Sequence, residues 1–129
     1  MNRRRLIAAV CLVTLPALAH AEERKKGGGS NFIQINTLTA TVIRADGRRG
    51  VMTVETGLDI PDAALHARAA ASTPRLQAAF AQVIQKYATG LNAGGVPNAD
   101  YLSQQLQRQA DAVLGRPGAR LLLGTILVN

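Results

Sequence analysis

The sequence contains few side chains that could perform catalysis. His66 is the only histidine after the first 21 residues, and Ser72 lies six residues beyond it. A hydrolytic site needs a serine beside a histidine that a third group orients. Contact between the two in space stays open, but a lone histidine on a helix surface is the ordinary case. We therefore expect no catalytic residues.

Three carboxylates, Glu55, Asp59 and Asp62, could meet at the end of a strand and bind a divalent cation. No histidine supports them, however, and Asp62 suits the positive end of a helix dipole. The sole cysteine, Cys11, lies in the N-terminal leader, so the remaining chain offers no thiolate ligand or nucleophile. We expect no metal site and no cofactor.

Three arginines, Arg44, Arg48 and Arg49, flank a turn expected at Asp46-Gly47. They are candidates for binding an acidic partner or an acidic lipid surface, and a solvated turn is the alternative. The net charge of the whole chain is +7, but after the leader 12 basic residues face 8 acidic ones, a net charge of +4. This modest charge, the aromatic content of 3% and the lack of tryptophan argue against nucleic-acid binding.

Residues 1–21 have the parts of an export signal. A basic segment precedes an apolar run over residues 6–19, and Ala19-His20-Ala21 has the form of a signal-peptidase site. The run is 14 residues long and contains Pro16, whereas a membrane helix needs about 20 apolar residues. A cleaved leader and a periplasmic protein are therefore favoured over a membrane anchor. The arginines also fit the twin-arginine pattern, which we rank below general secretion. The signal residues are Arg3, Arg4, Leu6, Ile7, Ala19 and Ala21.

The remaining chain divides into a tether and one domain. Residues 22–30 combine charged residues with glycine and serine, which is typical of a flexible linker. Residues 31–129 form the single domain, because a chain of this size, with 47% hydrophobic residues overall, can bury one core.

Residues 31–60 predict a β-hairpin. Asp46-Gly47 is typical of a two-residue type I′ turn, and the segments on both sides are rich in isoleucine, valine and threonine. Hydrophobicity alternates along the second strand, so one face should lie on a core and the other should face water or a partner. The core side is expected to consist of Met52, Val54, Thr56, Leu58 and Ile60.

Three helices are expected next. A short alanine-rich helix ends near Ala71, Thr73 should cap the second helix, Asn98 should cap the third, and Gly115 should end it. The second and third helices each have one apolar stripe at helical spacing. The stripes are Leu76, Phe80, Val83, Ile84, Tyr87 and Leu91, followed by Leu102, Leu106, Ala110, Val113 and Leu114.

The chain ends in an almost entirely apolar segment, residues 118–129. As an extended strand it would be apolar on both sides, so we expect it to be buried within the sheet. The fold class is therefore α+β, with an N-terminal β-hairpin, two to three helices packed on one sheet, and a C-terminal buried strand. The expected sides are Leu121, Leu123, Thr125 and Leu127 against Leu122, Gly124, Ile126 and Val128.

The strand at residues 50–59, the helix start at 73–80, the helix segment 101–106 and the closing apolar strand occur in an order that resembles a known domain. Over about residues 32–128 the chain is similar to the periplasmic domain of the flagellar basal-body protein FliL. The resemblance implies a stomatin-like fold, assembly into a ring and contact with the stator units of a rotary motor. FliL keeps an uncleaved transmembrane helix, whereas this leader has the cleavable form.

These observations predict an exported, non-enzymatic envelope module. It would bind a second copy of itself or a membrane-protein partner through the sheet and the three arginines. The alternative is a small periplasmic enzyme or ligand carrier, whose site would consist of backbone and scattered polar groups. Self-association and capture of an envelope partner would distinguish the first class from the second.

Overall fold

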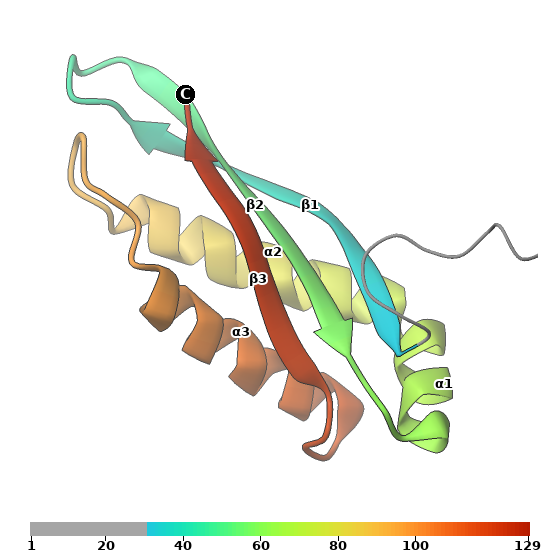
Figure 1. The fold of residues 1–129 in the computed structure, drawn as a ribbon. Coiled ribbons are helices and arrows are strands. Elements are labelled where there is room, and N and C mark those ends of the chain that lie inside the picture. The colour runs from blue at the N-terminus through green and yellow to red at the C-terminus, as the bar shows by residue number, and fades with distance from the viewer. Residues whose placement is uncertain (1–30) are drawn as a thin grey trace, which may run out of the picture.

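The computed structural model describes residues 31–129, which form three strands and three helices (Figure 1). The predicted leader and tether lie outside this range. Within it, no helix has the length and apolar character needed to cross a membrane. The elements are β1 (Phe32–Ile43), β2 (Arg49–Asp59), α1 (Ala63–Ala71), α2 (Thr73–Thr89), α3 (Ala99–Leu114) and β3 (Arg120–Val128).

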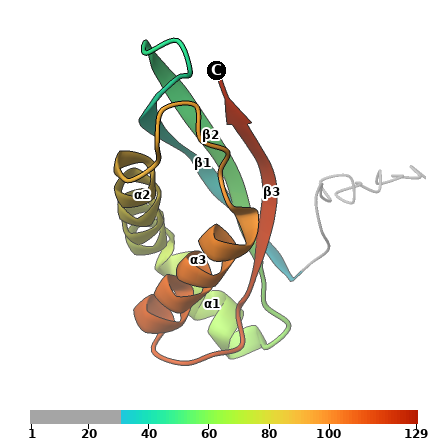
Figure 2. The same cartoon turned by 90° about the vertical axis from the view of Figure 1, so that its left-hand side faces the viewer.

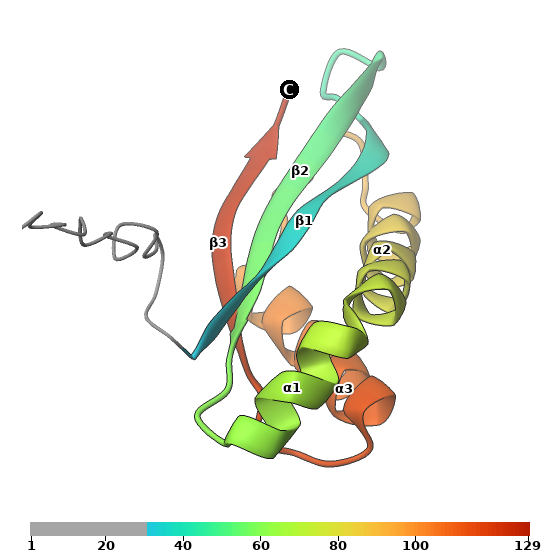
Figure 3. The same ribbon diagram turned by 90° about the vertical axis from the view of Figure 1, so that its right-hand side faces the viewer.

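The strands form one antiparallel sheet in the order β1-β2-β3. α2 packs under β1 and α3 under β3, while α1 packs against the other two helices at one end (Figure 1). Figures 2 and 3 show α2 and α3 on the same side of the sheet, so no described element lies over the opposite face. The predicted α+β fold, with its N-terminal hairpin and C-terminal strand, is confirmed.

The alternation predicted for β2 is confirmed. Met52, Val54, Thr56 and Leu58 point toward the helices and are at most 3% exposed, and Ile60 is fully buried. They pack on the predicted stripes of α2 and α3, whose fully buried members are Leu76, Phe80, Ile84, Leu102, Leu106, Ala110 and Leu114.

The hairpin turn differs from the predicted two-residue type. The Arg44 N–H donates to the Arg48 carbonyl oxygen at 2.8 Å, which leaves residues 45–47 as a three-residue loop. Gly47 has a φ of +82°, a conformation that glycine adopts readily. The Asp46 carboxylate accepts a hydrogen bond from the Arg48 N–H at 2.9 Å. This bond favours the longer loop, since aspartate commonly bonds a backbone N–H two residues on.

β3 lies at an edge of the sheet, so the prediction of a strand buried on both sides is wrong. Leu121 is buried at 7% exposure, whereas Leu127 is 51% and Val128 is 41% exposed. The hairpin already occupies one side of β2, and β3 pairs with the other side as the last strand. An apolar run indicates a strand, but it does not indicate whether that strand lies in the middle or at the edge of the sheet, because the strand order depends on the path of the whole chain.

Both outer strands carry a β-bulge opposite Glu55 of β2. Residues 36–37 of β1 and residues 124–125 of β3 each oppose this single residue. An inserted residue reverses the alternation beyond it. The predicted sides of β3 are therefore wrong after the bulge, where Ile126 takes the place opposite Val54. The side that faces the helices consists of Leu121, Leu123, Ile126 and Val128.

The helix boundaries agree with the prediction at three of four positions. α1 ends at Ala71, Asn98 caps α3 by accepting a hydrogen bond from the third residue of that helix at 3.0 Å, and Gly115 ends it with a φ of +83°. Thr73, however, does not cap α2. It is the first residue of that helix, and its hydroxyl donates back to the Ala70 carbonyl oxygen of α1 at 3.0 Å.

Candidate functional site

The three predicted contact arginines lie together at the hairpin tip, and all are exposed. Arg44 Nη2 lies 3.3 Å from Asp46 Oδ2, so the one carboxylate of the turn is already paired. Within residues 31–129, Arg48 and Arg49 make no ion pair. The tip therefore presents two guanidinium groups that are free to meet an acidic partner.

Apolar side chains are exposed beside the tip. The loop between α2 and α3 reaches the hairpin, where the Gly94 N–H donates to the Ile43 carbonyl oxygen at 2.9 Å. Val96 in this loop is 85% exposed, and Ile43 is 42% exposed. On the uncovered face Val51 is 46% exposed. A depression of about 260 Å³ lies between loop and hairpin, lined by Val42, Ile43, Arg44, Ala45, Leu91, Gly94, Gly95, Val96, Pro97 and Val128.

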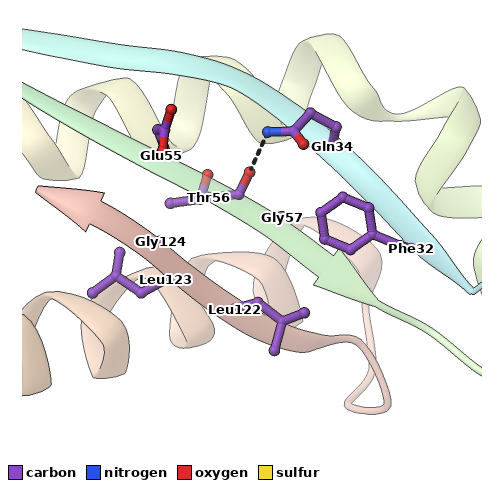
Figure 4. Close-up of a pocket in the computed structure, with 8 residues that line it drawn as sticks. All are labelled: Phe32, Gln34, Glu55, Thr56, Gly57, Leu122, Leu123 and Gly124. Carbon is purple, nitrogen blue, oxygen red and sulfur yellow. Dashed lines mark hydrogen bonds between the residues drawn. The ribbon is translucent and has the colours of Figure 1, made fainter. Parts of the chain in front are cut away.

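A second depression, of about 230 Å³, lies on the uncovered face (Figure 4). Phe32 of β1 lies over Gly57 of β2, where an added β-carbon would collide with the phenyl ring. Gln34 Nε2 donates to the Thr56 carbonyl oxygen at 3.4 Å, close to the level of the bulges. The lining residues are Phe32, Gln34, Glu55, Thr56, Gly57, Leu122, Leu123 and Gly124.

His66 and Ser72, the two residues that could have formed a hydrolytic site, are not joined by a hydrogen bond. His66 lies half-buried on α1, and Ser72 lies at the junction of α1 and α2. No hydrogen bond joins these two side chains in the described part of the chain. His66 Nε2 is buried without a partner and lies beside a depression with Pro61 and Asn31. This arrangement contains neither an activated nucleophile nor a group that orients the imidazole.

The three carboxylates considered for metal binding have separate surroundings. Across residues 31–129, no three His, Cys, Asp or Glu side chains are grouped closely enough to hold an ion. Asp62 accepts the Leu65 N–H at 2.8 Å as the cap of α1 and bonds Arg116 Nη2 at 2.9 Å. The Leu65 N–H, and next the Arg116 side chain, hold the pKa of Asp62 below its ordinary value. Glu55 lies instead on the uncovered sheet face.

Comparison with known proteins adds no assignment. No protein-family model matches the chain. No curated protein matches it either. The similarity to FliL therefore stays a prediction from the order of elements. The export residues Arg3, Arg4, Leu6, Ile7, Ala19 and Ala21 lie outside the described residues, so the predicted signal stays a prediction as well.

Sequence analysis missed the role of Gln107. The helical pattern places it on the polar side of α3, yet its side chain bonds the backbone of β3. No local signal distinguishes it from Gln104 and Gln105 beside it, because the bond depends on where β3 lies. Its place at the edge of the sheet bears on how the protein could bind another strand.

Proposed function

We propose that the protein is an exported, non-enzymatic module of the cell envelope that binds a second copy of itself or a membrane-protein partner. Its contact surface would be the uncovered sheet face together with the arginine tip. A role like that of FliL at the flagellar basal body, in contact with stator units, is the specific form that the order of elements favours.

The observation that carries the proposal is the one-sided sheet. In the part of the chain that the structure describes, helices lie over one face alone (Figures 2 and 3). The other face exposes Val51 and Leu127, at 46% and 51%. Exposed apolar side chains on a sheet, next to charged residues, are typical of a protein contact surface. The unpaired Arg48 and Arg49 beside them would add electrostatic selectivity for an acidic partner.

The size of the depressions favours this proposal over a ligand carrier. The two depressions at the candidate site measure about 230 and 260 Å³. Pockets that enclose small molecules usually measure about 300–1,000 Å³ and bury most of the ligand. A surface with shallow hollows suits a protein chain better than an enclosed small molecule.

The test reverses the charge of the tip with Arg44→Glu, Arg48→Glu and Arg49→Glu in one variant. These side chains lie outside the core, so the fold should survive while capture of a partner from envelope extracts falls and loses its salt dependence. A matched control changes Arg75, Lys86 and Arg108, which are exposed on the helices, to glutamate. If both triple variants capture the same partners equally well, the tip is not the contact surface.

A further inference from the structure

The outer edge of β3 has backbone groups without partners, and their positions follow from the hydrogen bonds to β2. Val51 and Asn129 exchange both backbone bonds, at 2.9 and 3.0 Å. In an antiparallel pair, residues whose groups face the neighbour alternate with residues whose groups face away. The N–H and C=O groups of Ile126 and Val128 therefore point away from β2, toward the open edge.

Gln107 of α3 occupies the other end of this edge. Its Oε1 accepts the Leu121 N–H at 2.9 Å, and its Nε2 donates to the Ala119 carbonyl oxygen at 2.7 Å. A side-chain amide offers the same donor and acceptor as a peptide group. Gln107 therefore takes the place of a neighbouring strand over residues 119–121. The next outward groups, those of Leu123, have no such partner in the described chain.

The open part of the edge also lacks the usual protection against pairing. Residues 121–129 contain no charged side chain and no proline, which are the residues that commonly block an exposed edge. Leu127 and Val128 lie there at 51% and 41% exposure. β1 is the other edge, but its exposed side chains are mostly polar, and its last carbonyl group, that of Ile43, is bonded by Gly94. Pairing at β3 would bury more apolar surface.

We propose that residues 123–128 of β3 pair antiparallel with the same segment of a second copy. A two-fold axis perpendicular to the sheet brings identical edges together and closes the assembly as a dimer. Neither strand brings a charge to this contact, so two copies meet without like-charge repulsion. The proposal rests on the self-association proposed above and adds the open edge of β3 to its contact surface. Because one short strand pair is a small interface, the dimer should depend on protein concentration.

Disulfide crosslinking tests the contact directly. In the full chain with Cys11→Ser, which removes the only native cysteine, Thr125→Cys, Ile126→Cys and Leu127→Cys are made separately. Residue 126 lies on the axis if Leu123 opposes Val128, residue 125 lies next to the axis if Leu123 opposes Ile126, and residue 127 lies on the axis if Ile126 opposes Val128. Each register brings one pair of cysteines within disulfide range, so one of the three variants should form a covalent dimer on oxidation. Thr41→Cys on β1 is the control and should form no covalent dimer. Crosslinking at Thr41→Cys, or at none of the three β3 positions, overturns the proposal.

A second variant removes the pairing without a crosslink. Ile126→Pro deletes one outward N–H and leaves the hydrogen bonds to β2 intact. Thr41→Pro deletes the equivalent outward N–H of β1. By light scattering at high concentration, the native chain and Thr41→Pro should have twice the mass of Ile126→Pro. A native chain that is monomeric at every concentration overturns the edge pairing. If that monomer still captures a partner through the arginine tip, the proposed function stands without it.

Discussion

At the scale of single residues, Phe32 and Gly57 define the uncovered face. The ring of Phe32 lies over Gly57 of β2, which has no side chain to occupy this place on the uncovered face (Figure 4). This contact keeps Gly57 buried although no helix of residues 31–129 lies over it. It joins an apolar ring from one outer strand to the central strand, and so it stabilises the start of the hairpin.

Gly57→Ala should therefore destabilise the protein. The added methyl group would collide with the Phe32 ring, and overpacking of this kind costs about 1–3 kcal/mol. Urea unfolding followed by circular dichroism measures the change. Gly90→Ala is the control, because a β-carbon there meets no atom closer than 3.8 Å, and its effect should stay within about 0.5 kcal/mol. Equal midpoints for the two variants would contradict the role of Gly57.

Asp62 should make stability depend on pH in the acid range. Its pKa in the folded state lies below the ordinary 3.8, first because of the Leu65 N–H and then because of Arg116. The charged form is thus favoured by folding, so its contribution is complete above about pH 3.8 and is lost as pH falls through the folded-state pKa. At pH 7 the melting temperature should decrease from native to Asp62→Asn, which keeps a cap acceptor, and further to Asp62→Ala. The difference between native and Asp62→Ala should shrink at pH 2; an unchanged difference there would contradict this account.

At the scale of elements, the sequence predicted which side of a strand or helix is buried, but it did not predict which strands lie beside one another. The alternation along β2 and the stripes of α2 and α3 were predicted correctly, because each depends on one segment lying against one core. The edge position of β3 and the bulge of β1 depend on other strands. The bulge of β3 had a local sign that the prediction did not use, because Gly124 lies in it and an isolated glycine inside a strand often marks a bulge. Leu123 illustrates the consequence. It is only partly buried, so Leu123→Ala should cost less than the 2–5 kcal/mol typical of a core leucine.

The candidate site was predictable to the same extent. The arginine tip follows from the turn residues, and its exposure was expected from the sequence. The bonds between the Gln107 side chain and the backbone of β3 could not be predicted, because they form only when α3 and the edge of β3 lie side by side. In the same way, the sequence indicated that one face of β2 could meet a partner, but the absence of any described element over that face is a property of the assembled sheet.

At the scale of the whole molecule, Gln107 separates the stability of one chain from the association of two. Gln107→Ala would leave the Leu121 N–H and the Ala119 carbonyl group without their side-chain partner. Losing these bonds should reduce the free energy of unfolding of the monomer by on the order of 1–3 kcal/mol. The same change lengthens the open edge, so a second copy of β3 would find more backbone groups to bond.

The variant should therefore unfold at lower urea concentration and yet dimerise at lower protein concentration than the native chain. Gln104→Ala, at an exposed position of α3, is the control and should change neither quantity. Unfolding measured at low protein concentration and mass measured by light scattering separate the two effects. A fall in stability with no gain in association would mean that Gln107 supports the fold alone, and that a second copy does not pair with residues 119–121.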